Sequence, residues 1–143
     1  MKDKTIVGSI ELVGIPAFGL HDIDAKIDTG ADSNALHCDN IFIDDNNNVH
    51  FQLLDDVHPS YHDKKIKLPV YKIKKVKSSN GEVQNRASIK IKIIFFNEEY
   101  ETVISLTDRS SMKYPMLIGK NFLLNNFLVD VSKEYLSKEM RGV

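Results

Sequence analysis

Apolar and polar residues alternate along most of this chain, with the two-residue period of strands that bury one face. The alternation is clearest where Ile23, Ala25 and Ile27 are separated by Asp24 and Lys26. The same pattern, bounded by turn residues, predicts strands over Thr5–Val13, Asp22–Ile27, Asn34–Ile43, Val49–Leu54, Ile66–Lys77, Val83–Phe96 and Tyr100–Leu106. Only Lys120–Asn125 favours a helix, so the sequence predicts an all-β protein with one short C-terminal helix.

Two polar features interrupt the predicted strands. The turn cluster Asp44–Asn48 and the charged stretch Asp55–Lys65 form a polar insertion at about residues 44–65, where a loop is expected. Farther on, the turn Ser78-Ser79-Asn80-Gly81 joins Lys72–Lys77 to Glu82–Phe96, and this arrangement predicts a long hairpin. A second tight turn is expected at Asn97-Glu98.

Length and composition indicate one domain over residues 1–143. A chain of 143 residues with 42% apolar residues can bury a sizeable core, and its net charge of -1 favours neither a nucleic-acid partner nor a membrane surface. Cys38 is the single cysteine, so we expect no internal disulfide. Because no segment has the pattern of a secretion signal or a membrane span, a cytoplasmic location is the default expectation.

The stretch most informative about chemistry is Asp28-Thr29-Gly30, which follows the strand ending at Ile27. A carboxylate at this strand-to-loop corner is held rigidly, and Gly30 allows a backbone amide to approach it. Thr29 offers a hydroxyl that can reach a partner loop. This triplet is the active-site signature of aspartic proteases, so we expect Asp28 to be catalytic, with Thr29 and Gly30 shaping its loop.

Two motifs resemble the hallmarks of the retropepsins. Asp28-Thr29-Gly30-Ala31-Asp32 is similar to their catalytic loop, and Met116–Leu123 resembles their second motif, in which Ile-Gly and a basic residue precede a short helix. The hairpin stands where a retropepsin carries its flap. The resemblance implies a closed acid-protease barrel, in which Ala31, Asp32, Ser79, Asn80 and Gly81 contact or cover the substrate. It also suggests that Asp32 pairs with Lys120.

A wider resemblance covers nearly the whole chain. The segments Ala25–Ala31 with Asn34–His37, Val76–Gly81, Leu106–Arg109, and Phe127–Asp130 with Tyr135-Leu136 resemble the retropepsin-like bacterial family labelled ATP-dependent zinc proteases. The label disagrees with the residues, because the chain has neither a phosphate-binding loop for ATP nor a His-Glu-x-x-His helix for zinc. We therefore expect no cofactor and no metal.

Peptide hydrolysis by aspartic proteases needs two neighbouring carboxylates that share one proton. One chain supplies only Asp28, so the resemblance implies a C2 homodimer that acts on a peptide or protein substrate. Basic residues gather in the hairpin, which favours an acidic substrate, although lysines can also simply protect a solvated ribbon. The family is sometimes associated with glutamate ligases, so a polyglutamate-like peptide is one such substrate. Arg109 is a candidate clamp for a substrate carboxylate, or it closes a surface turn.

The histidines leave further alternatives open. His37 lies one strand from Asp28 and is either a structural histidine bonded to a neighbouring strand or a substrate contact. The polar insertion contains His50, His58 and His62, which could bind a metal ion. The better interpretation is that they are solvent-exposed loop residues. Two other functions therefore stay open: a peptide-binding barrel that does not cut its ligand, and a metal-dependent hydrolase.

Overall fold

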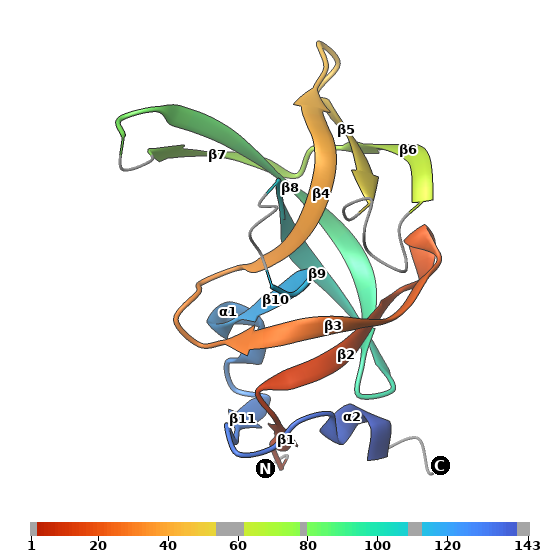
Figure 1. Ribbon diagram of the computed structural model, residues 1–143, viewed down its shortest axis with the longest axis vertical. Coiled ribbons are helices and arrows are strands. Elements are labelled where there is room, and N and C mark those ends of the chain that lie inside the picture. The colour runs from red at the N-terminus through yellow and green to blue at the C-terminus, as the bar shows by residue number, and fades with distance from the viewer. Residues whose placement is uncertain (1–2, 54–61, 78–79, 109–112, 140–143) are drawn as a thin grey trace.

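The computed structural model describes residues 3–53, 62–77, 80–108 and 113–139, and strands dominate it (Figure 1). The strands are β1 (Thr5–Val7), β2 (Ile10–Ile15), β3 (Leu20–Asp28), β4 (Asn34–Ile43), β5 (Asn48–Leu53), β6 (His62–Pro69), β7 (Lys72–Lys77), β8 (Val83–Phe95), β9 (Glu98–Thr107), β10 (Met116–Gly119) and β11 (Phe127–Val129). The helices are the 3-10 turn η1 (Pro16–Phe18), α1 (Lys120–Leu123) and α2 (Leu136–Glu139).

Six strands close into a barrel, as the sequence predicts. Strand β3 pairs with β2, β2 with β8, β8 with β9, and β9 with β4. Strand β10 completes the ring, because it pairs in parallel with β3 and antiparallel with β4. A closed ring leaves no free edge among these strands, and it brings the end of β3 beside the end of β10.

The barrel interior is apolar and takes alternate residues from each strand. Ile23, Ala25 and Ile27 of β3 are buried, as their alternation predicts. At the end of the barrel where β8 turns into β9, the rings of Phe122 and Phe127 contact Phe95 edge-on. Their centroids lie 5.6 and 5.3 Å from that of Phe95. This packing fixes the short helix α1 and strand β11 against β8.

The predicted hairpin is present as β7 and the first half of β8. Residues Val83 to Ser88 of β8 pair with β7, whereas Ser88 to Phe95 pair with β9. The long strand β8 therefore belongs to the barrel and also extends beyond it. In Figure 1 the ribbon of β7 and β8 projects toward the same side as the loop that joins β3 to β4.

The polar insertion is more ordered than predicted. Strands β5 and β6 extend the sheet from β4, so the prediction of a loop up to Lys65 is wrong from His62 onward. The predicted strand Ile66–Lys77 breaks at Val70 and Tyr71, because the chain changes partners there. The amide of Val70 donates to the Asn47 carbonyl at 3.0 Å, and that of Tyr71 donates to the Ser88 carbonyl at 2.8 Å.

The predicted first strand is likewise two strands. It breaks at Gly8, where a Cβ would collide with the backbone of Lys133, so only glycine fits. Strand β1 pairs with β11, while β2 enters the barrel. The tight turn after β8 lies at Phe96 and Asn97, both with positive φ, one residue earlier than predicted.

The prediction of a single helix is incomplete, since α2 follows α1. No helix among the described residues is long and apolar enough to cross a bilayer.

Candidate active site

Asp28 ends β3 and begins a tight loop, as predicted. Its Oδ1 accepts a hydrogen bond from the Gly30 amide at 3.0 Å, and its backbone carbonyl accepts one from Ala31 at 3.2 Å. A Cβ on Gly30 would lie 3.3 Å from Oδ1, so glycine gives the amide room to approach. The Asp28 side chain is half-buried and Thr29 is exposed. The loop thus presents a fixed carboxylate and a free hydroxyl at the surface.

The loop after Asp28 wraps around the junction of β10 and α1. The Lys120 amide donates to the Ala31 carbonyl at 2.8 Å, and the Asn121 amide donates to the Asp32 carbonyl at 3.2 Å. Gly119 pairs with Asp28 in the parallel register. A Cβ on Gly119 would lie 2.7 Å from the Ser33 carbonyl carbon, so the crossing of the two segments requires glycine.

Asn34 is hydrogen-bonded to the strand end at this crossing. It was not singled out from the sequence as a site residue. It is 3% exposed. Its Oδ1 accepts from the Gly119 amide at 3.0 Å, and its Nδ2 donates to Thr102 Oγ1 at 3.1 Å. One buried amide side chain therefore joins β4, β10 and β9. Two signals in the sequence point to it: its position shortly after the Asp28 loop and its place in the family-like segment Asn34–His37.

The predicted pair of Asp32 and Lys120 is confirmed, with Lys120 Nζ 3.1 Å from Asp32 Oδ1. Both side chains are more than half exposed, so the pair contributes little stability on its own. It joins the same two segments as the backbone bonds and restricts the direction in which Asp32 points.

The tip of the hairpin is described only in part. Gly81 has φ of 89°, which favours glycine, and the Glu82 amide donates to Asn80 Oδ1 at 3.1 Å. Ser79 and Arg109 lie outside the described residues. Asn80 and Gly81 are exposed, and no contact with Asp28 joins them to the catalytic loop within the described part of this single chain.

A continuous row of paired residues runs across the outer face of the sheet. Lys26 pairs with Leu117, Leu117 with Ala35, Ala35 with Ser105, Ser105 with Ser88, and Ser88 with Lys72. Paired residues point to the same face, and so do residues two apart on a strand. Asp28 lies two residues after Lys26 on β3, so it is on this outer face. Lys74 and Arg86 lie two residues from Lys72 and Ser88, so all three basic residues, Lys72, Lys74 and Arg86, are on the outer face as well.

Two histidines have structural surroundings. His37 is only 4% exposed, which favours a structural role, and the Asp39 Oδ1 that lies 3.9 Å from its Nε2 belongs to the same strand and not to a neighbouring one. His50 Nε2 lies 2.7 Å from Asp44 Oδ2 and its ring stacks on Phe42. The hydrogen bond from His50, more than any other contact, lowers the pKa of the Asp44 carboxyl.

The alternative of a histidine metal site falls largely outside the described residues. His58 lies outside them, as does the side chain of His62. No group of three or more His, Cys, Asp or Glu side chains that could hold a metal ion occurs in the described ranges.

A six-stranded barrel whose Asp-Thr-Gly loop wraps an Ile-Gly strand end defines the class of retropepsin-like proteins. The chain belongs to the RimB-like family, described as retropepsin-like aspartic endopeptidase RimB, whose model matches residues 6–140. That description specifies an aspartic endopeptidase, in agreement with the Asp28 motif.

Curated relatives carry a different name. The chain is 36% identical over 148 residues to a probable alpha-L-glutamate ligase of Shewanella halifaxensis, and 29% identical over 145 residues to one of Parasynechococcus marenigrum. Each alignment covers 99% of this chain but only 31% of the relative, so the chain spans about a third of their length.

A solved structure shares the fold. It is that of a Legionella pneumophila protein of unknown function, with a TM-score of 0.70, 23% identity, and coverage of 94% of this chain and 99% of that one.

Proposed function

We propose that this protein is an aspartic endopeptidase in which Asp28 of one chain and Asp28 of a second chain activate the attacking water. The observation that carries the proposal is the Asp28 loop, which fixes a half-buried carboxylate by the Gly30 amide at 3.0 Å. The ionised carboxylate of the pair would take a proton from water, and the protonated one would donate to the carbonyl oxygen of the peptide bond.

The single loop calls for a homodimer. One chain carries one Asp-Thr-Gly, and the chemistry needs two carboxylates, so a two-fold axis beside Asp28 completes the site. Thr29 is exposed in the single chain, where its hydroxyl is available to the loop of a partner. The hairpin of each chain would then cover one half of the bound peptide.

Charge on the catalytic face supports an acidic substrate. Lys72, Lys74 and Arg86 share this face, and none of them belongs to an ion pair among the described residues. The relatives are named as ligases of alpha-L-glutamate, so a chain of glutamates is a suitable substrate class for a peptidase of this family. Positive potential on the hairpin would draw such a chain into the site.

The test is cleavage of an internally quenched peptide of α-linked glutamates by the parent and by Asp28→Asn. We expect the variant to lose at least about a hundredfold in kcat/KM, because it cannot take the proton from water. Asp45→Asn, a matched change in the exposed turn after β4, should leave the rate unchanged. Circular dichroism of all three proteins checks that the fold is retained.

Other outcomes identify the alternatives. If Asp28→Asn cleaves as fast as the parent, Asp28 is not catalytic and the proposal is wrong. Loss of activity with a chelator but not with pepstatin indicates a metal-dependent hydrolase. A parent protein that binds the peptide and never cleaves it is a peptide-binding barrel.

A further inference from the structure

Lys26 is the residue next to Asp28 on the same face of β3. It precedes Asp28 by two positions on β3, and Ile27 between them is 7% exposed and faces the core. Residues two apart on a strand lie about 7 Å from each other on the same face. Lys26 is exposed, so its side chain reaches the space next to the carboxylate rather than the barrel interior.

The neighbours of Lys26 across the sheet are apolar. It is paired with Ile10 of β2 on one side and with Leu117 of β10 on the other, and both are half-buried. The next acid back along the same face, Asp24, accepts a hydrogen bond from the Tyr135 hydroxyl at 3.0 Å. Both cross-strand neighbours of Lys26 are therefore apolar, and neither is an acid that could pair with its ammonium group.

Lys26 differs from two lysines on the outer face of β8 and from Lys120 of α1, which have carboxylate partners. Lys90 Nζ lies 3.5 Å from Glu101, Lys92 Nζ lies 3.3 Å from Glu99, and Lys120 Nζ lies 3.1 Å from Asp32. Lys26 forms no ion pair within 4.0 Å in the described part of the chain. Its charge is therefore available to a ligand bound beside Asp28 on this face of β3.

We propose that Lys26 determines specificity by binding the side-chain carboxylate of the residue that flanks the scissile bond. This inference rests on the proposed peptidase function. In a C2 dimer, the two copies of Lys26 lie at equal distances on opposite sides of the paired Asp28 residues. Each would read one side of the cleaved bond, so the preferred bond lies between two acidic residues. The basic hairpin would act farther along the same peptide.

The test compares peptides that differ only in Glu or Gln at the two positions flanking the scissile bond. We expect the parent to prefer Glu by about tenfold or more in kcat/KM, as a charge pair formed in a covered site would give. Lys26→Met should cleave the Gln peptide as the parent does and lose the preference for Glu. Lys26→Glu should prefer a peptide with Lys at these positions.

Lys92→Met is the matched control, because Lys92 is exposed on the same face but paired with Glu99 far from Asp28. It should keep the full preference for Glu. The inference is wrong if the parent cleaves both peptides equally, or if Lys26→Met keeps the preference.

Binding separates this inference from the peptidase proposal. If no protein cleaves either peptide, the peptidase proposal has failed, and fluorescence anisotropy with the same peptides decides on Lys26. Tighter binding of the Glu peptide by the parent, lost in Lys26→Met, supports its role as a carboxylate-binding residue. Equal binding of the two peptides, or no binding, overturns it.

Discussion

Gly119 is the residue on which the geometry of the site depends most strictly. It pairs with Asp28, and its amide donates to the buried Oδ1 of Asn34 at 3.0 Å. The backbone of Ser33 crosses so close to it that no side chain fits between them. The position of the Asp28 carboxylate is therefore fixed by a contact between two backbone segments far apart in the sequence.

We predict that Gly119→Ala lowers the free energy of unfolding by about 1–3 kcal/mol or more, since its Cβ overlaps backbone that cannot move aside easily. The measurement is urea denaturation. Gly14→Ala is the control, because a Cβ there meets its nearest atoms at an ordinary 3.7 Å. Equal stability of the two variants would contradict the close crossing at Gly119.

The positions of individual site residues could be predicted where they belong to a short sequence motif. Asp28, Gly30 and the pair of Asp32 with Lys120 occupy the places that the sequence predicted. Asn34 was not singled out, because a buried asparagine whose side chain bonds to two neighbouring strands has no local pattern. The position of the turn was also missed, because Phe96 takes a positive φ that its residue type disfavours; its side chain is nevertheless buried, with 6% exposure.

Among the elements, α2 shows how a short helix is held by tertiary contacts. Glu11 of β2 is fully buried, and its Oε2 accepts from the Gly8 amide at 2.7 Å and the Leu136 amide at 3.1 Å. Its Oε1 accepts from the Ser137 amide at 2.9 Å and the Ser137 hydroxyl at 2.7 Å. One carboxylate thus accepts from backbone amides at the start of α2, which have no partner within the helix, and fastens the helix to the barrel.

We predict that Glu11→Gln destabilises the protein by about 1–3 kcal/mol, because the amide nitrogen that replaces one oxygen cannot accept from these donors. Thermal unfolding followed by circular dichroism measures the loss. Glu134→Gln, the same chemical change at an exposed position, should have almost no effect. A Glu11→Gln protein as stable as the parent would contradict the buried network.

Strand prediction succeeded wherever alternation is strict and failed where partners change. Strand β4 has the predicted bounds Asn34–Ile43, although its pairing with β5 shifts register between Asp39 and Phe42. The breaks at Gly8 and Val70 were missed, because each is set by which distant strand the chain pairs with next. Helix α2 was missed for a similar reason: its four residues are too few to show a period, and a buried glutamate anchors them.

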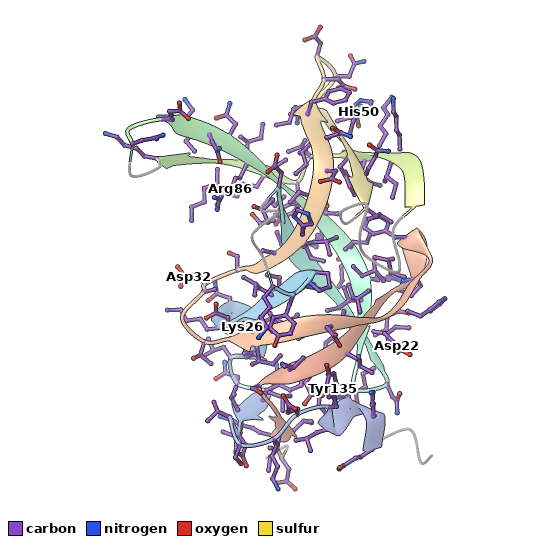
Figure 2. The ribbon with its side chains drawn as sticks, in the orientation of Figure 1. Asp22, Lys26, Asp32, His50, Arg86 and Tyr135 are labelled. Carbon is purple, nitrogen blue, oxygen red and sulfur yellow. The ribbon has the colours of Figure 1, made fainter. Side chains whose placement is uncertain are left out.

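For the whole molecule, the closed barrel presents Asp28 at its surface, and the projecting ribbon carries the basic side chains of Lys72, Lys74 and Arg86. Figure 2 labels Lys26 on β3 and Arg86 on β8, the two ends of the face proposed to hold the substrate. A single chain leaves this face open to solvent at Asp28 and Thr29. The central claim is that a second chain completes it, with each copy contributing one carboxylate.

The most direct measurement mixes parent and Asp28→Asn chains in varying proportion at a fixed total concentration and allows partners to exchange before cleavage is measured. If the site needs two intact Asp28 residues, only parent homodimers are active, and an equal mixture retains about a quarter of the parent rate. If each chain acts alone, about half of the rate remains and the decline is linear. A linear decline would contradict the shared active site.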